Sequence, residues 1–181
     1  MYRVVISDNS LFPYENYTSG WIGDDNWVTP QLPDGRWYWR VKARDNAGNE
    51  GGNSPTRWFE VDTTPPSGVT LVSPDNENTR SENSLWLDWT TGTDNHGPVL
   101  YRLLVSTYEN FASTILDTGW VDNDNWYLED LIDNRYYWKV QARDEAGNVF
   151  ENEVRWFIVE NTPPTTPRAV QLAIPSSEYA F

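Results

Sequence analysis

The feature that most constrains this chain is a motif that occurs twice. Residues 36–49 read RWYWRVKARDNAGN, and residues 135–148 read RYYWKVQARDEAGN. A repeat of this kind predicts two copies of one structural unit, so each copy must fold as a small domain. Small domains need efficient apolar burial, and this chain supplies eleven Trp, ten Tyr and six Phe for that purpose.

Apolar and polar side chains alternate along both copies of the motif. The apolar positions of the second copy are Tyr136, Trp138, Val140 and Ala142. A period of two is typical of a strand with one buried face. Both motifs end in Ala-Gly-Asn, where Gly48 and Gly147 can adopt a positive φ and turn the chain back. The motif therefore predicts a strand followed by a hairpin turn.

The repeat extends over most of the chain, because Trp21 matches Trp120 and residues 56–66 match residues 154–164. In the second copy, alternation and turn residues predict strands over 68–73, 84–89, 100–106, 115–120, 126–131, 135–143 and 154–159. Seven short strands without helical periodicity predict an all-β fold. We expect tandem antiparallel seven-stranded β-sandwiches.

Proline-rich borders divide the chain. The sequences TTPPS and NTPPTTP favour extended polyproline II geometry and form short, stiff spacers. The predicted segments are an incomplete unit over 1–63, a linker over 64–67, a complete unit over 68–160, a linker over 161–167 and a lone strand over 168–181. We call residues 1–63 unit one and residues 68–160 unit two, and we expect the units to form a rod.

Unit one is predicted to lack its first two strands, because Met1 aligns with Leu100 at the start of the third. At the other end, residues 168–175 read RAVQLAIP and resemble a first strand. The predicted assembly strand carries Val170, Leu172, Ile174, Tyr179 and Phe181. Two interpretations stay open. Either the chain is an excerpt of a longer array, or this strand completes unit one of the next molecule and builds a head-to-tail filament.

Three stretches of unit two carry a family resemblance. SLWLDWT with Trp89, VLYRLLVS, and the run from Leu131 through Tyr136 to ARDEAGN resemble a fibronectin type III domain or a close immunoglobulin-like relative. The resemblance implies tandem repeats of a bacterial or archaeal extracellular protein. It also implies a corner tyrosine at Tyr136. Unit one has Trp37 at the matching position, which puts the corresponding hydrogen bond in doubt there.

Charge and composition exclude several function classes. The net charge of -14 disfavours nucleic acid and anionic membrane surfaces as partners. The sequence has no apolar run near the roughly 20 residues of a membrane span, so we expect no membrane insertion. Cysteine is absent, and the single histidine, His96, lies in the turn-like sequence TDNHGP without an obvious serine partner. We therefore predict a protein that is not an enzyme, with His96 as a solvated loop residue.

Two acidic turns are candidate calcium sites, and otherwise no cofactor is expected. The residues are Asp24, Asp25, Asp122 and Asp124, which occupy the same turn in both copies. Carboxylate oxygens are ligands that calcium selects. However, neither turn has the spacing of an EF-hand, and Asp and Asn are also ordinary turn residues.

Four tryptophans flank these turns: Trp21, Trp27, Trp120 and Trp126. Exposed, they would form stacking platforms for sugar rings; buried, they would close one end of each sandwich. Asn16, in Asn-Tyr-Thr, is the N-glycosylation acceptor that the sequence offers.

These patterns predict an exported, extracellular structural repeat protein of a rod, stalk or filament, with a role in surface structure or adhesion. The expected partners are other copies of the chain, neighbouring repeats of a longer chain, and cell-surface polysaccharide. The alternative is a carbohydrate-binding or spacer module of a secreted hydrolase.

Overall fold

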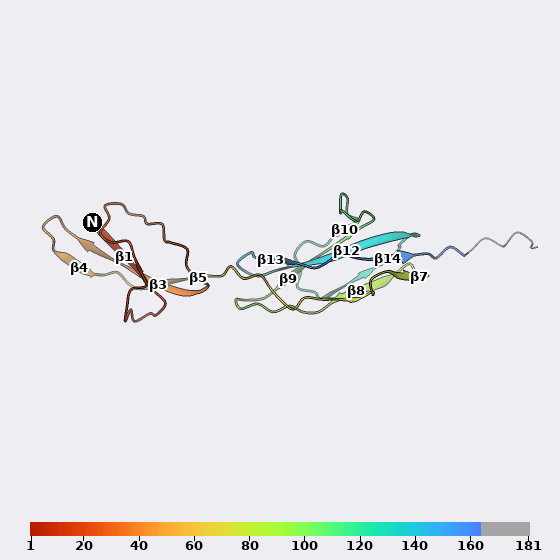
Figure 1. Cartoon of the computed structure of the whole chain (residues 1–181), viewed down its shortest axis with the longest axis horizontal. Helices are drawn as coiled ribbons and strands as arrows, with labels where there is room; N and C mark the ends of the chain where they lie inside the picture. The colour runs from red at the N-terminus through yellow and green to blue at the C-terminus, as the bar shows by residue number, and fades with distance from the viewer. Residues whose placement is uncertain (164–181) are drawn as a thin grey trace, which may run out of the picture.

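A computed structural model describes residues 1–163. All regular secondary structure in that range consists of β-strands. Figure 1 shows two groups of strands that follow one another along the long axis, joined by the segment that contains Pro65 and Pro66. No helix within residues 1–163 could cross a membrane. The predicted assembly strand over 168–181 lies outside the described residues.

Unit two is an antiparallel β-sandwich, as predicted. One sheet has the order β11-β8-β6, and the other has the order β10-β9-β12-β14-β7, with β13 beside β12. The strands are β6 (Leu71–Ser73), β7 (Asn78–Arg80), β8 (Leu85–Trp89), β9 (Leu100–Ser106), β10 (Leu116–Asp117), β11 (Asn125–Leu128), β12 (Asn134–Arg143), β13 (Val149–Glu151) and β14 (Arg155–Val159). The sandwich confirms the fold class read from the repeat.

Alternation along β12 places its apolar side chains inside the sandwich. Trp138, Val140 and Ala142 are fully buried, and they pack in one cluster with Leu87 of β8 and Phe157 of β14. Each of these aromatic side chains buries roughly 150–250 Å². The core of unit two therefore needs side chains from both sheets.

The strands predicted over 68–73 and 126–131 are shorter in the structure, and three larger differences are found elsewhere. The strand expected over 115–120 is limited to the two residues of β10. Two short strands, β7 and β13, were not predicted. β7 pairs in parallel with β14, and its sequence, Asn-Thr-Arg, has no apolar residue to signal a strand.

A corner hydrogen bond closes the approach to the long central strand in both units. In unit two the Tyr136 hydroxyl donates to the Ile132 carbonyl at 2.9 Å. In unit one Trp37 Nε1 donates to the Pro33 carbonyl, also at 2.9 Å and also four residues upstream. The doubt about unit one was therefore wrong, because an indole N–H can replace the phenol hydroxyl as the donor.

Unit one contains a single sheet. Its strands are β1 (Tyr2–Ser7), β2 (Tyr17–Thr18), β3 (Gly35–Arg44), β4 (Glu50–Asn53) and β5 (Arg57–Val61). The sheet order is β2-β1-β3-β4, with β5 also beside β3. In unit two, β10, β9 and β12 correspond to β2, β1 and β3, while β13 corresponds to β4 and β14 to β5. The described residues of unit one contain no second sheet. Within the described residues, unit one therefore has no counterpart of β6 and β8.

We predict that Tyr136→Phe lowers the free energy of unfolding of unit two by about 1–2 kcal/mol. The substitution removes the corner hydrogen bond and leaves the Ile132 carbonyl without its donor. Urea unfolding followed by hydrogen exchange measures the change unit by unit.

Tyr137→Phe is the matched control. Tyr137 faces the opposite side of β12 and its hydroxyl donates no hydrogen bond within residues 1–163, so a change within about 0.5 kcal/mol is expected. Equal effects of the two substitutions would show that the corner bond contributes nothing special.

Candidate functional site

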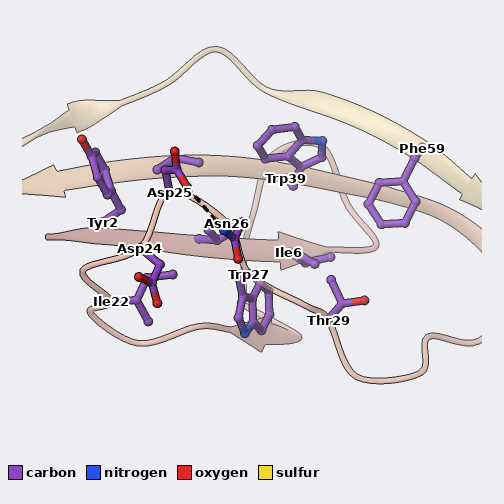
Figure 2. A pocket seen from close by; sticks show the side chains of 12 residues that line it. Tyr2, Ile6, Ile22, Asp24, Asp25, Asn26, Trp27, Thr29, Trp39 and Phe59 are labelled. Carbon is purple, nitrogen blue, oxygen red and sulfur yellow. Dashed lines mark hydrogen bonds between the residues drawn. The ribbon is translucent and has the colours of Figure 1, made fainter.

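The most distinctive surface of the molecule is an apolar groove on the sheet of unit one, which we call the open face. Its volume is about 580 Å³. It is lined by Tyr2, Val4, Ile6, Ile22, Asp24, Asp25, Asn26, Trp27, Thr29, Trp39, Val41 and Phe59. In Figure 2, Tyr2 lies at one end of the groove and Phe59 at the other, with Trp27 on the loop and Trp39 on the sheet.

The open face corresponds to the buried core of unit two. Tyr2 is 44% exposed, whereas its equivalent Tyr101 is 3% exposed. Trp39 is half-buried, whereas its equivalent Trp138 is fully buried. The difference arises because the sheet that contains β8 covers these positions in unit two, and nothing in the described part of unit one replaces it.

The loop beside the open face also differs from its counterpart in unit two, because it has no neighbouring strand. In unit two, β11 pairs with β8, so that Trp126 lies opposite Leu87. The equivalent residues of unit one, 26–29, form no strand. A strand needs a partner for its backbone N–H and C=O groups, and residues 26–29 have lost theirs. The open face is thus bordered by backbone that another strand can pair with.

The predicted calcium residues lie at this border in unit one. Asp24 and Asp25 line the groove, and the Asp25 carboxylate accepts a hydrogen bond from the Asn26 side chain at 3.3 Å. In unit two Asp122 is exposed, and Asp124 accepts a hydrogen bond from the Asn125 side chain at 3.0 Å. Within residues 1–163 neither turn gathers three metal-binding side chains. Calcium binding at these turns stays a prediction.

The four predicted stacking tryptophans are all partly buried. Trp21 and Trp120 each have an arginine guanidinium over one ring face, Arg44 and Arg143, at 4.4 Å from the ring centroid. Each of these rings therefore has at most one face for a sugar. Of the other two, Trp27 lines the open face and Trp126 packs against the core of unit two. Their role in glycan stacking stays a prediction.

Asn16 is exposed, and its side-chain oxygen accepts a hydrogen bond from the Asp8 backbone. Its glycosylation also stays a prediction. An exposed aromatic pair was missed by the sequence analysis: Trp86 and Tyr127, 56% and 44% exposed, with ring centroids 5.1 Å apart. Both residues fall on the outward positions of β8 and β11, so the alternation of these strands was the signal that could have found them.

Comparison with known proteins found similar solved structures and no other match. No family model matches the chain, and no curated protein matches it. The fibronectin(III)-like modules of CbhA from Clostridium thermocellum are 15% identical, with a TM-score of 0.46, over 87% of this chain and 77% of that one. The FN1-FN3 domains of chicken CNTN1 are 18% identical, with a TM-score of 0.41, over 87% of this chain and 55% of that one.

The fold itself is defined by the strand order of unit two. Three strands, β11-β8-β6, face a sheet built around β9, β12 and β14. The corner hydrogen bond of Tyr136 precedes the central strand, as it does in immunoglobulin-like sandwiches. Unit two is an antiparallel β-sandwich with three strands in one sheet, and the sequence similarity to known proteins adds no family to that assignment.

Proposed function

We propose that this chain is a non-catalytic structural module of an extracellular array, in which the open face of unit one is completed by a β-strand from another molecule. One observation carries the proposal: the apolar sheet residues of the open face are equivalent to buried core residues of unit two, as Tyr2 is to Tyr101, Trp39 to Trp138 and Phe59 to Phe157. A face of this kind gains stability when apolar side chains and backbone partners reach it. The role is therefore mechanical, with units joined into a rod or filament.

The occupant that we propose is the C-terminal segment of a second copy. By sequence, Val170 and Leu172 match Val69 and Leu71, which precede Pro74 as residues 170–172 precede Pro175. Val69 and Leu71 are both buried in the core of unit two. The segment therefore has the apolar pattern of a strand that unit two uses to cover the same face.

Its expected place is beside residues 26–29, where the backbone lacks a partner strand. There the segment would take the place that β8 has beside β11 in unit two, although its sequence matches the β6 segment, which pairs with β8. The donor of one molecule and the acceptor of the next are different surfaces, so each contact leaves a free end and the assembly grows head to tail.

The energetics favour an assembly that depends on concentration. Burying the three aliphatic side chains of the donor, Val170, Leu172 and Ile174, contributes roughly 5–9 kcal/mol. Association costs about 4–15 kcal/mol in lost freedom of motion. Tyr179 and Phe181 are therefore needed as further apolar anchors.

We expect the full chain to form oligomers whose mass rises with concentration, and a chain that ends at Thr166 to stay monomeric. The shortened chain lacks the donor but keeps the open face. Light scattering after size exclusion measures both masses. In the full chain, Leu172→Asp should abolish assembly, because it places a charge against the apolar groove.

The control is Ile132→Asp, since Ile132 is an exposed apolar residue away from the groove. This variant should assemble like the parent. If the full chain is a monomer at every concentration, self-assembly is refuted. The open face would then be a binding surface for strands of a neighbouring repeat in a longer array, of which this chain is an excerpt.

A second candidate function is glycan binding, and the exposed pair Trp86 and Tyr127 favours it. Adjacent aromatic rings on a flat sheet can stack on sugar rings. If this function operates, the chain is retained by insoluble polysaccharide and Trp86→Ala loses most of that retention. Trp120→Ala tests whether the Trp120 ring, one face of which Arg143 covers, also contributes to retention. Retention that is unchanged in Trp86→Ala would refute the role of this pair.

A further inference from the structure

Three carboxylates meet where the two units join. Asp62 follows the last strand of unit one, Asp94 lies in the loop between β8 and β9, and Asp144 lies in the turn after β12. One oxygen from each residue falls within 4.8 Å of the other two. The sequence analysis did not group these residues, because more than eighty residues separate the first from the last.

Turn chemistry accounts for two of the three. Asp144 accepts hydrogen bonds from the backbone N–H groups of Gly147 and Asn148, at 2.7 and 2.8 Å. Asp94 accepts one from the His96 backbone at 2.8 Å. Both residues therefore cap their own turns, as Asp commonly does. Capping alone would require nothing more of them.

Asp62 is different. Its side chain is 4% exposed, and its Oδ2 atom, which is buried, has no hydrogen-bond partner within residues 1–163. Its other oxygen accepts a bond from the Thr64 backbone at 3.2 Å. A buried carboxylate oxygen without a partner is costly unless something compensates its charge. Asp62 Oδ2 is therefore a buried oxygen without a hydrogen-bond partner, in a residue that lies beside two more carboxylates.

The surroundings provide little positive charge. Within the described residues, the sole basic side chain close to any of the three is His96, whose Nδ1 lies 3.9 Å from Asp62 Oδ2. This nitrogen is itself buried and without a hydrogen-bond partner, although the His96 side chain is 27% exposed. His96 is therefore a loop residue that is only partly solvated. No lysine or arginine forms an ion pair with Asp62, Asp94 or Asp144 in residues 1–163.

We propose that Asp62, Asp94 and Asp144 bind one calcium ion that fixes unit one to unit two. Calcium takes oxygen ligands at 2.3–2.6 Å, so two oxygens on one ion lie at most about 5 Å apart. The separation of up to 4.8 Å meets this limit. Magnesium, with bonds of about 2.0–2.1 Å, would require a tighter cluster.

Hydrogen bonds at the junction already hold Asp62 and Asp144 near each other. The Asn148 side chain donates to the Asp62 carbonyl at 3.1 Å and to the Asp144 carboxylate at 2.8 Å. Asn148 therefore links the end of unit one to the turn that carries Asp144. In unit one, the equivalent Asp45 is exposed, and its carboxylate accepts hydrogen bonds from the Asn49 side chain and from the backbone N–H groups of Asn49 and Ala47. The Asn49 side chain contributes most to holding the pKa of Asp45 below its ordinary value. Asp45 has no carboxylate of a preceding unit beside it in the described structure.

Isothermal titration of the full chain with calcium chloride tests the site. We expect one calcium ion per chain at this junction, and at least tenfold weaker binding in Asp62→Asn and Asp94→Asn. Magnesium chloride should bind more weakly than calcium. Calcium should also slow hydrogen exchange of the backbone amides of residues 63, 64, 67 and 68 in the parent chain and not in Asp94→Asn.

The matched control is Asp122→Asn, which removes a carboxylate from the exposed turn of unit two and should leave the junction site intact. Asp94 is in a loop, so its variant should keep the fold; circular dichroism checks this. The proposal is overturned if calcium does not bind, if it binds equally well to Asp62→Asn and Asp94→Asn, or if Asp122→Asn alone abolishes binding.

Discussion

The structure depends on one constraint: a β-sheet with an apolar face needs a second layer to cover that face. Unit two meets the constraint with β6, β8 and β11, and its Trp138 and Phe157 are fully buried as a result. Unit one has a sheet equivalent to the one that contains β9 and β12, with aromatic residues at the same positions, but no second sheet in the described residues. The open face, the unpaired backbone of residues 26–29 and the proposed strand addition all follow from that difference.

A second theme is the way in which each unit closes onto the segment that follows it. Asp34 accepts hydrogen bonds from Thr63 and Thr64, and the equivalent Asp133 accepts them from Asn161 and Thr162. The Thr64 hydroxyl contributes most to holding the pKa of Asp34 below its ordinary value. Both units therefore bind the segment that follows them, and the proposed calcium site would further stiffen the junction between unit one and unit two.

Much of the fold could be predicted from the sequence, because period-two alternation and Ala-Gly-Asn turns are local signals. The repeat added a comparison within one chain, which showed that unit one lacks two strands. What could not be predicted depends on the third dimension. The parallel pairing of β7 has no apolar pattern, and Trp37 replaces the corner tyrosine through a donor that sequence matching does not recognise. The meeting of Asp62, Asp94 and Asp144 requires the relative placement of two units.

The most direct test of the central claim is to supply the missing layer. Residues 68–99 of unit two, fused in front of Met1, would give unit one its first two strands in the register of the repeat. The account predicts that Trp39 becomes buried, with a blue shift of tryptophan emission, and that the amides of residues 26–29 gain protection from hydrogen exchange. If Trp39 stays half-buried and residues 26–29 stay unprotected in the fused chain, the open face is not the acceptor of a missing sheet and the account is wrong.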